Sequence, residues 1–315
     1  MATMRQMMWL GGSSLELQSC PIPEPGPDEV RVRVHACGVC MTEVHQHEGL
    51  VPPSAPAPFV WGHEWCGTVE AFGPGVAGLA VGAPVSVSGR GGFSEYVVVP
   101  TSSLVPLPPD VPLDAGIFVE PLACCLASVE AALPTDGMTA LVTGAGPMGQ
   151  MVAQLARLFG ARTIVTDLDP ERLILAKELG AEATVNPTRE SLADTVETLT
   201  GGSGVDVAWE SAGHPAALES CLEAVRPGGT VVMVGVNSTE AHLALPLYRF
   251  HRRQLRLIGV YGSGGVETFH RAAALMPRLE LTRMIAHRFG LADLEEAFSL
   301  ARSGRQGKIL IEPWR

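Results

Sequence analysis

VTGAGPMGQ, residues 142–150, places glycines at Gly144, Gly146 and Gly149, the spacing Gly-X-Gly-X-X-Gly. A short apolar run precedes this motif, and residues 148–159, which follow, carry apolar side chains at helical spacing. Such a turn between a strand and a helix lets the backbone approach a pyrophosphate, whose charge meets the helix N-terminus. The motif is weak by itself, because it also occurs as a purely structural glycine turn. Its interpretation therefore depends on the sequence around it.

An acid follows the glycine motif at the expected distance. Asp167 ends the apolar run TIVTD, close to the interval of about 20 residues typical of dinucleotide-binding folds. A carboxylate there accepts hydrogen bonds from both ribose hydroxyls and repels a 2′-phosphate, so the sequence predicts NAD rather than NADP. Asp169 is an alternative acid, although TDLDPER is more typical of a helix N-cap at that position. The predicted cofactor-binding residues in this region are Gly144, Gly146, Pro147, Met148, Gly149 and Asp167.

Strands and helices alternate on both sides of the motif. Helices are expected over residues 121–133, 170–179 and 215–225, and the apolar runs ALVTG, TIVTD, VDVAWES, TVVMVG and LRLIGV are typical of buried strands. Alternation of this kind predicts an α/β domain with a doubly wound parallel sheet. We assign residues 121–259 to this nucleotide-binding domain.

The sequence on both sides of the nucleotide-binding domain differs from it in composition and pattern. Residues 15–105 are rich in Val, Pro and Gly, with period-two runs separated by turn clusters, which indicates antiparallel strands and loops. Two helices are expected near residues 266–276 and 291–301, and the run KILIEP predicts a last strand. Residues 1–120 and 260–315 are therefore expected to form one β-rich domain that the nucleotide-binding domain interrupts.

Composition excludes several classes of protein. A chain of 315 residues suits two domains, and 46% hydrophobic with 17% charged residues is typical of a globular protein. The net charge of −11 without a basic stripe argues against nucleic acid as a partner. We find no signal-peptide core and expect no apolar run of the roughly 18 residues that span a membrane, so a cytoplasmic protein is expected. Seven scattered cysteines do not suggest a disulfide framework.

A second cluster predicts a metal site. GVCMTEVHQHEG, residues 38–49, contains Cys40, and GHE, residues 62–64, contains His63. Together with a carboxylate from Glu64 or Glu120, they would form a mixed S/N/O site with a fourth position open, as in catalytic zinc sites. Zinc polarises an alcohol oxygen and lowers its pKa without redox chemistry of its own.

Each of these residues also has a simpler interpretation. A Cys-X-X-Cys pair, here Cys37 and Cys40, can be a redox pair or half of a zinc knuckle, but neither the required context nor a second pair is present. His63 alone would more often be a structural histidine. We expect Cys37 and His47 to be bystanders. Burial is expected for Cys66, and it is favoured over metal binding for Cys124 and Cys125. Phe59, Trp61 and Trp65 flank the metal motif and either line a substrate pocket or, as is commoner for aromatic residues, pack in the core.

Six motifs in order along the chain resemble the zinc-dependent medium-chain alcohol dehydrogenase family, particularly its polyol and threonine dehydrogenase branch. These motifs are GVCMTEVH, GHEWCGTVEAFGPGVAGLAVG, GGFSEYVVVP, EPLACCLASVE, VTGAGPMGQ and RPGGTVVMVG. The resemblance implies a GroES-like β-rich catalytic domain and a Rossmann domain. It also implies NAD-dependent oxidation of a small secondary alcohol, such as a polyol, cyclitol, sugar or amino alcohol, to a ketone by a homo-oligomer, a dimer or tetramer.

The resemblance also implies roles for single residues. Cys40 and His63 match the zinc ligands, and Glu64 and Glu120 match two glutamates that can each enter or leave the metal's coordination shell. Thr42 matches the hydroxyl that bonds the alcohol and passes its proton outward to a histidine at the position of His45. Lys308 matches a basic residue that meets the cofactor pyrophosphate.

The sequence departs from the family in two places. Glu43 stands where the family has an aspartate that orients the ligand histidine, so its side chain is one methylene longer. A lobe with four closely spaced cysteines, which holds a structural zinc in the family, is missing before GGFSEY. We therefore expect one zinc per chain and an unusual oligomer.

Two alternatives remain at this point. A zinc-free quinone or enoyl reductase of the same superfamily would lack the residues Cys40, His63 and Glu120 and would tend to prefer NADPH. A non-catalytic nucleotide-sensing protein would need only the glycine motif, and not the metal and proton-relay residues.

Overall fold

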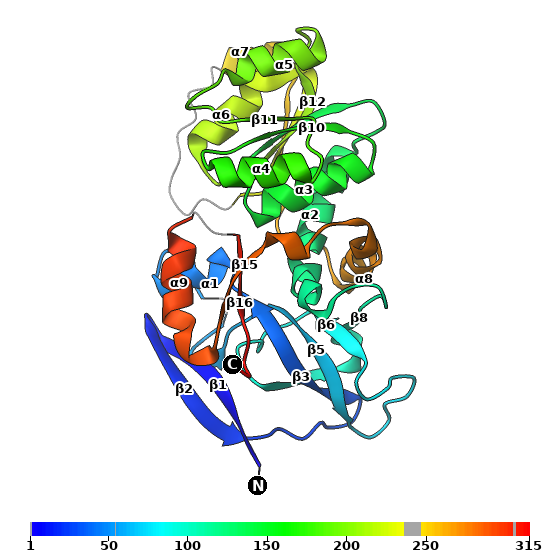
Figure 1. The fold of residues 1–315 in the computed structure, drawn as a ribbon, viewed down its shortest axis with the longest axis vertical. Coiled ribbons are helices and arrows are strands. Elements are labelled where there is room, and N and C mark those ends of the chain that lie inside the picture. Colours follow the sequence, from blue (N-terminus) through cyan, green and yellow to red (C-terminus); the bar gives the residue numbers. More distant parts are fainter. Residues whose placement is uncertain (1, 54, 236–246, 305–306) are drawn as a thin grey trace. The chain divides into compact units, whose positions relative to one another are not determined.

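The computed structural model describes residues 2–53, 55–235, 247–304 and 307–315. The chain forms two compact units (Figure 1). Unit 1 comprises Met1–Pro121 and Gly265–Arg315, and unit 2 comprises Leu122–Gly264. The first unit is therefore built from two segments that lie far apart in the sequence.

Unit 2 contains a six-stranded parallel sheet. The strand order is β11-β10-β9-β12-β13-β14, with β9 (Thr139–Thr143) and β12 (Val205–Glu210) at the centre. The other strands are β10 (Arg162–Thr166), β11 (Ala183–Val185), β13 (Val225–Met233) and β14 (Arg256–Gly259). Because β9 is flanked by β10 and β12, the strand order reverses there, which is the topological switch point where such sheets bind ligands. The predicted α/β fold is confirmed.

Three helices of unit 2 begin close to where the sequence signals predict. Those near the cofactor loop are α3 (Pro147–Leu158) and α4 (Pro170–Glu178), each with a proline in its first turn. Asp169 caps α4, since its side chain accepts a hydrogen bond from Glu171 N at 2.9 Å, so the N-cap interpretation of this acid is confirmed. The remaining helices are α5 (Leu192–Thr200), α6 (Pro215–Ala224) and α7 (Leu247–Arg252), of which α5 and α7 were not predicted.

Unit 1 contains two sheets, which confirms the β-rich domain. The seven-stranded sheet follows the order β15-β16-β3-β5-β6-β8, with β7 paired to β3. Its strands are β3 (Glu29–Gly38), β5 (Glu64–Phe72), β6 (Pro84–Val87), β7 (Tyr96–Pro100), β8 (Leu104–Pro106), β15 (Ile285–Phe289) and β16 (Lys308–Ile311). The smaller sheet has the order β2-β1-β4, with β1 (Thr3–Gly11), β2 (Ser14–Pro21) and β4 (Phe59–Val60). Strand structure thus begins at residue 3, earlier than the predicted residue 15.

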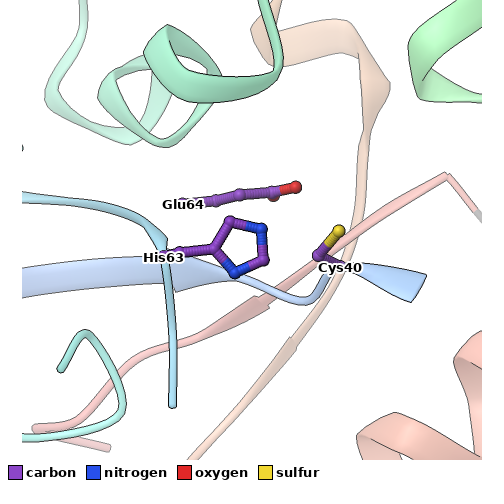
Figure 2. A group of neighbouring side chains, drawn as sticks. All are labelled: Cys40, His63 and Glu64. Atoms are coloured by element: carbon purple, nitrogen blue, oxygen red, sulfur yellow. The ribbon is translucent and has the colours of Figure 1, made fainter. Parts of the chain in front are cut away.

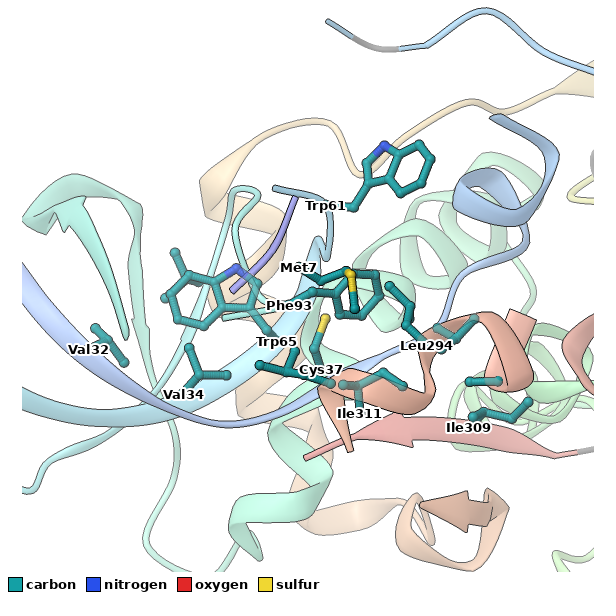
Figure 3. Packing of buried hydrophobic residues seen from close by; sticks show 14 of the residues in the cluster. Met7, Val32, Val34, Cys37, Trp61, Trp65, Phe93, Leu294, Ile309 and Ile311 are labelled. Carbon is teal, nitrogen blue, oxygen red and sulfur yellow. The ribbon is translucent and has the colours of Figure 1, made fainter. Parts of the chain in front are cut away.

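The core of unit 1 joins its two chain segments. Trp65 and Phe93 are fully buried and pack with Cys37 from β3, as Figure 3 shows. Leu294, from α9 (Leu294–Arg302), and Ile309 on β16 belong to the same cluster. Each such side chain contributes about 1.5–3 kcal/mol of hydrophobic free energy when buried. This packing fixes the C-terminal strand β16 beside β3, where the metal-site sequence begins.

Three further helices belong wholly or partly to unit 1. Helix α1 (Met41–His47) was not predicted and carries most of the reactive side chains of the 38–49 stretch. Helix α2 (Val119–Ala132) begins two residues earlier than expected, so Glu120 lies in its first turn. Helix α8 (Val266–Leu275) agrees with the prediction within one residue.

One stretch, Leu113–Ala132, is long and apolar enough by composition to cross a membrane, with a mean hydropathy of 1.5. The expectation that no apolar run reaches this length is therefore wrong. Within the structure, 67% of that window is buried, as in a core helix of a globular protein. Its apolar character is thus explained by burial inside the protein.

Candidate active site

Helix α1 starts directly after β3 and brings Cys40 to its N-terminus. Cys40 is the N-cap residue in extended conformation, and the side chain of Glu43 turns back to accept a hydrogen bond from Cys40 N at 3.3 Å. This reciprocal arrangement resembles a capping box, which fixes where a helix begins. Glu43 is buried, with 2% of its surface exposed. The local sequence therefore sets the position of the thiol.

Glu43 also connects α1 to the GHE segment. Its Oε1 accepts a hydrogen bond from Gly62 N at 2.9 Å and lies 2.9 Å from His63 Nδ1. Because Nδ1 is engaged by the carboxylate, the imidazole can present Nε2 to a metal. The extra methylene of Glu43 thus still allows direct contact with the histidine.

Three side chains converge at this point (Figure 2). One ligand atom each from Cys40, His63 and Glu64 lies within 4.8 Å of the others. The thiolate, imidazole and carboxylate are the donor types that bind zinc in catalytic sites. Although burial opposes protonation, Glu43 and Cys40 raise the pKa of His63 above its usual value. The anionic surroundings therefore favour a cation, and the residues present fit a zinc ion.

Lys308 lies beside Glu64 of this group, although the resemblance predicted a role for it at the cofactor pyrophosphate. Its Nζ forms an ion pair with Glu64 Oε2 and donates a hydrogen bond to Val39 O at 3.1 Å. Burial lowers the pKa of this ammonium, but the neighbouring charges of Glu64, Cys40 and Glu120 outweigh it and raise the pKa above its usual value. Sequence reasoning missed this pair, since Lys308 and Glu64 lie 244 positions apart in the sequence. Its role at the pyrophosphate stays a prediction.

Glu120 is half-buried at the start of α2 and does not belong to the group of three converging ligand atoms. Of the two predicted carboxylates, Glu64 is the one that the structure brings to Cys40 and His63. Glu120 acts on Lys308 through its charge. Both carboxylates therefore surround the same cation.

Two glycines make room for this arrangement. A Cβ at Gly38 would lie 2.5 Å from Glu64 Oε2 and 2.6 Å from Lys308 Cε. Gly62 has a φ of +93°, and a Cβ there would lie 2.7 Å from Phe93 N. Sequence reasoning assigned neither residue a role. The only sequence signal was their position directly before the reactive segments.

Four other residues in or next to the 38–49 stretch have different surroundings. Thr42 and His45 are half-buried and three positions apart on α1, so they lie on the same face of the helix. His47 Nε2 lies 3.1 Å from Ser13 O, and its ring packs edge-on against Trp61. Cys37 is buried in the core. His47 and Cys37 thus have structural contacts that explain them.

The expected burial of the other candidates is largely confirmed. Cys66 and Cys125 are buried, whereas Cys124 is half-exposed. Trp61 and Trp65 belong to the core cluster, and Phe59 packs against it. All seven cysteines are free thiols.

The glycine loop of unit 2 has the geometry of a phosphate-binding turn. Gly144 has a φ of +89°, a conformation that favours glycine. A Cβ on Gly149 would lie 1.8 Å from Gly144 O, so helix α3 can pack this closely only without a side chain. A Cβ on Gly146 would meet only Arg172 Nη1, at 3.9 Å. The space at Gly146 therefore fits the approach of a cofactor pyrophosphate.

Asp167 lies just beyond the end of β10, beside this loop. Its Oδ2 accepts a hydrogen bond from Ala145 N at 2.6 Å, and its Oδ1 accepts one from Asp169 N at 2.9 Å. Arg172 Nη1 lies 3.7 Å from Asp167 Oδ2. The acid is thus held against the loop by backbone groups from both sides.

Comparisons with known proteins agree with this fold and site. Residues 26–109 match the alcohol dehydrogenase GroES-like domain, and residues 147–278 match the zinc-binding dehydrogenase family. L-threonine 3-dehydrogenase of Ruegeria pomeroyi is 32% identical over 95% of this chain and 96% of its own length. The corresponding enzyme of Mesorhizobium japonicum is 33% identical over 94% of each.

Solved structures of similar fold give the same result. A zinc-binding dehydrogenase from Sinorhizobium meliloti, bound to NADP, superposes with a TM-score of 0.90 at 31% identity and covers 99% of this chain and 100% of its own. The 2R,3R-butanediol dehydrogenase of Bacillus subtilis has a TM-score of 0.88 at 28% identity, covering 98% and 99%.

This chain belongs to the zinc-dependent medium-chain alcohol dehydrogenase family, in its threonine and polyol dehydrogenase-like branch. It is an oxidoreductase that converts an alcohol to a ketone with a nicotinamide cofactor and zinc. The expected fold, enzyme class and cofactor types are therefore confirmed.

Proposed function

We propose that Cys40, His63 and one glutamate hold a single catalytic zinc ion in each chain. The convergence of the Cys40, His63 and Glu64 ligand atoms within 4.8 Å is the observation that carries this proposal. When bound, zinc acts as a Lewis acid that makes the substrate hydroxyl more acidic. Glu43 orients His63 through Nδ1, which is how carboxylates commonly support metal-bound histidines.

Glu64 and Glu120 share the remaining ligand role in this proposal. The ion pair with Lys308 holds Glu64 in place and reduces its negative charge. Glu120, in the first turn of α2, supplies the alternative carboxylate. Exchange between the two glutamates would keep one carboxylate at the metal. Lys308, which is paired with Glu64 and feels the charge of Glu120, would balance the charge of the carboxylates.

Thr42 and His45 form the proposed path for the alcohol proton. Their positions three residues apart on α1 place both side chains on one helix face, starting next to Cys40. Thr42 would accept a hydrogen bond from the substrate hydroxyl and relay the proton toward His45, and a bound nicotinamide would supply the acceptor for the hydride of the carbinol carbon. A histidine can act as the general base that receives this proton.

The cofactor is proposed to bind on the glycine loop of unit 2, with NAD preferred over NADP. Gly144, Gly146, Pro147, Met148 and Gly149 provide the turn and the helix N-terminus for the pyrophosphate. Asp167 supports the preference for NAD by its negative charge, although Arg172 lies near enough to weaken it. Equal affinities for NAD and NADP in direct binding measurements would contradict the assignment of Asp167.

The two units have separate tasks in this proposal. Unit 1 is the catalytic domain, and unit 2 is the nucleotide-binding domain, with boundaries near residues 120 and 260. The substrate is a small secondary alcohol of the polyol, cyclitol, sugar or amino alcohol type. Relatives named for threonine, 2R,3R-butanediol and galactitol 1-phosphate support this range. We further propose a cytoplasmic enzyme without a nucleic-acid or membrane partner.

A homo-oligomer, a dimer or tetramer, is also proposed. Strand β14 ends the parallel sheet, and among the described residues no strand pairs with its outer edge. Unpaired edge strands are templates for association with another chain. Leu257 on this strand is 39% exposed, and Tyr261, two residues beyond it, is 96% exposed. Light scattering after gel filtration, with Leu257→Lys as the variant, tests whether this edge forms the contact.

Metal analysis combined with a substrate screen tests the proposed function. The purified protein should contain one equivalent of zinc per chain, measured by mass spectrometry of the metal. It should form NADH with members of a panel of polyols, aminocyclitols and hydroxy amino acids. Two zinc equivalents would contradict the single site. Full turnover of an alcohol by the zinc-free protein would contradict the metal mechanism.

A further inference from the structure

A second acid lies at the carboxyl edge of the parallel sheet, on the side of β9 away from Asp167. Glu210 is the last residue of β12 and is in register with Thr143, the last residue of β9. Asp167 directly follows β10, the other neighbour of β9. The glycine loop, which begins after Thr143, therefore starts between two acids, one at the end of each neighbouring strand.

The carboxylate of Glu210 holds the turn that follows it. Its Oε1 accepts hydrogen bonds from Ala212 N and Gly213 N, both at 2.8 Å. Glu210 is only 3% exposed, whereas Ala212 is exposed and Gly213 is half-buried. A ligand on this side of β9 therefore meets the turn of residues 211–213, and the carboxylate can act on that ligand only through the turn.

This turn packs directly against the first residue of the glycine loop. Ser211 N donates a hydrogen bond to Thr143 O at 2.8 Å, which ties the turn to the end of β9. A Cβ on Gly144 would lie 2.7 Å from Ala212 N. The conformation of the turn and that of the glycine loop are therefore coupled by contact.

The end of β13 confines the turn from the other side. Val234 N and Gly235 N both donate hydrogen bonds to Glu210 O, each at 2.8 Å. A Cβ on Gly235 would lie 2.3 Å from Gly213 N and 2.9 Å from Glu210 Oε2, so this close approach requires glycine. Gly213 itself has a φ of +67°, which favours glycine. The turn is thus held in one conformation by backbone contacts and by the carboxylate.

The charge of this acid is kept at a cost. Burial raises the pKa of Glu210 above its usual value, and the hydrogen bonds from Ala212 N and Gly213 N oppose this shift only in part. A neutral amide could accept the same two bonds, but a carboxylate makes them shorter and stronger. A buried acid with a shifted pKa at the ligand-binding edge of a sheet is typical of functional sites.

The position of the turn indicates which part of the cofactor it faces. Sheets with this strand order bind a dinucleotide across the switch point, with one mononucleotide on each half of the sheet. Asp167 belongs to the half formed by β9, β10 and β11, where the adenosine ribose is expected. The turn of residues 211–213 belongs to the half formed by β12, β13 and β14. It therefore lies on the side of the nicotinamide mononucleotide.

We propose that Glu210 is a positioning residue for the nicotinamide half of the cofactor, because it fixes the turn of residues 211–213 against which this half binds. The inference rests on the proposed binding of NAD at the glycine loop, and it adds a residue that the cofactor does not touch. In this role Glu210 sets the affinity for the whole dinucleotide, but not the affinity for its adenosine half.

Titration calorimetry of the full chain with NAD and with AMP tests the proposal, at a temperature where each variant is fully folded. Glu210→Gln keeps the shape of the side chain and removes its charge. It should raise the Kd for NAD about 10-fold, the difference expected between hydrogen bonds to a charged and to a neutral acceptor. The Kd for AMP should stay unchanged. Asp167→Asn should weaken the binding of both ligands, because it changes the adenosine side.

Asp206→Asn is the matched control. Asp206 lies near the opposite end of the same strand, and its Oδ2 accepts a hydrogen bond from Thr139 N at 2.8 Å. The variant loses the same kind of charge-assisted bond far from the glycine loop. It should lower the urea midpoint and leave the Kd for NAD unchanged. A purely structural role of Glu210 predicts the same behaviour for Glu210→Gln.

Equal NAD affinity in the wild type and Glu210→Gln, or an equal loss of NAD and AMP affinity, overturns the proposal. If Glu210→Gln does not fold, Gly235→Ala decides, because its new Cβ presses on the same turn and on Glu210 Oε2. A loss of NAD affinity alone then supports the proposal, and unchanged NAD affinity overturns it. If neither Gly146→Ala nor Asp167→Asn weakens NAD binding, the proposed cofactor site is wrong, and the role of Glu210 is overturned with it.

Discussion

The two predicted sites are built in different ways. The glycine loop, defined as residues 144–149 with Asp167, closes through a hydrogen bond between residues 22 positions apart, Ala145 N to Asp167 Oδ2. The metal corner, defined as Cys40, Glu43, His63, Glu64 and Lys308, includes a hydrogen bond across 269 positions, Lys308 Nζ to Val39 O. The first site is formed mainly by the backbone conformation of one loop, and the second is formed by side chains from segments far apart in the sequence.

This difference determines what each site tolerates. In the glycine loop, the space around Gly144, Gly146 and Gly149 decides function, so added atoms should be harmful. In the metal corner, buried charges compensate one another, so removed charges should be harmful. The following predictions test that contrast, beginning with the largest expected effect.

Cys40→Ser should abolish zinc binding and lower alcohol oxidation on the order of 1,000-fold, because the Lewis acid supplies several kcal/mol of stabilisation. NAD affinity should remain, since the glycine loop belongs to unit 2. Zinc content, turnover and NAD titration provide the readouts. Cys20→Ser, a change at the half-exposed cysteine of β2, serves as the control. Normal zinc content in Cys40→Ser would show that the metal corner is wrongly assigned.

Glu43→Gln should weaken zinc binding by about 10- to 100-fold, the usual effect of losing a carboxylate that supports a metal-bound histidine. The carboxylate contacts both Gly62 N and His63 Nδ1, and the amide keeps the shape while losing the charge. Competition with a chelator measures the affinity. Glu43→Asp, which restores the charge, should recover part of it. If Glu43→Gln and Glu43→Asp bind zinc with equal affinity, the negative charge of Glu43 does not contribute to zinc binding.

Gly149→Ala should lower the free energy of unfolding by roughly 1–3 kcal/mol, since the new Cβ overlaps Gly144 O and overpacking has costs of this size. Gly146→Ala should have the same free energy of unfolding as the wild type, because the new Cβ meets only Arg172 Nη1, at 3.9 Å. It should nevertheless bind NAD more weakly, because the Cβ occupies space that the pyrophosphate needs. Urea unfolding and NAD titration separate the two. Equal stability of both variants would contradict the packing role of Gly149.

A second His–carboxylate pair, His35 with Asp114, is partly exposed in unit 1 and can be compared with the more buried pair His63–Glu43. Asp114 Oδ1 lies 2.5 Å from His35 Nε2, and Oδ2 lies 2.5 Å from Arg288 Nη2. Burial alone would raise the pKa of Asp114, but Arg288 and His35 outweigh it and hold the pKa below its usual value.

Asp114→Asn should therefore destabilise the protein slightly at pH 7, where the carboxylate of the wild type is ionised. A lowered pKa in the folded state gives stability that is present above the unfolded value of about 3.9 and is lost as pH falls through the folded value. The difference between wild type and variant should thus shrink in acid. Urea unfolding at pH 7 and pH 3 measures it, with Asp110→Asn as an exposed control. A difference that is independent of pH would contradict the ion pair.

Much of the fold could be predicted from the sequence, because local patterns decide it. The apolar runs gave the parallel strands from β9 to β14 with the exception of the three-residue β11, and Asp169 was correctly expected to cap α4. Helix α5 was missed, and α1 was hidden because its seven residues carry reactive side chains rather than an apolar stripe. Short elements contain too few residues to show a period.

The candidate site was predictable only in part. The structure brings together Cys40, His63 and Glu64, which the resemblance grouped as zinc ligands, and it places Glu43 in contact with His63. The partner of Glu64 was not foreseen, because the strand pairing between β3 and β16 brings Lys308 to it. No local pattern reports which charged residue of a distant strand will face a given acid.

The sequence by itself determined the glycine loop, its acid and the alternation of strands and helices, because these depend on backbone freedom and on apolar periods that are read locally. The tertiary structure alone decided that Lys308 pairs with Glu64 and that the turn of residues 88–92 lies against the His63 segment, where Gly92 N donates a hydrogen bond to Gly62 O. Both depend on hydrogen bonds and packing between segments that are distant in the chain. Such contacts form only when the buried core of unit 1 brings its two segments together.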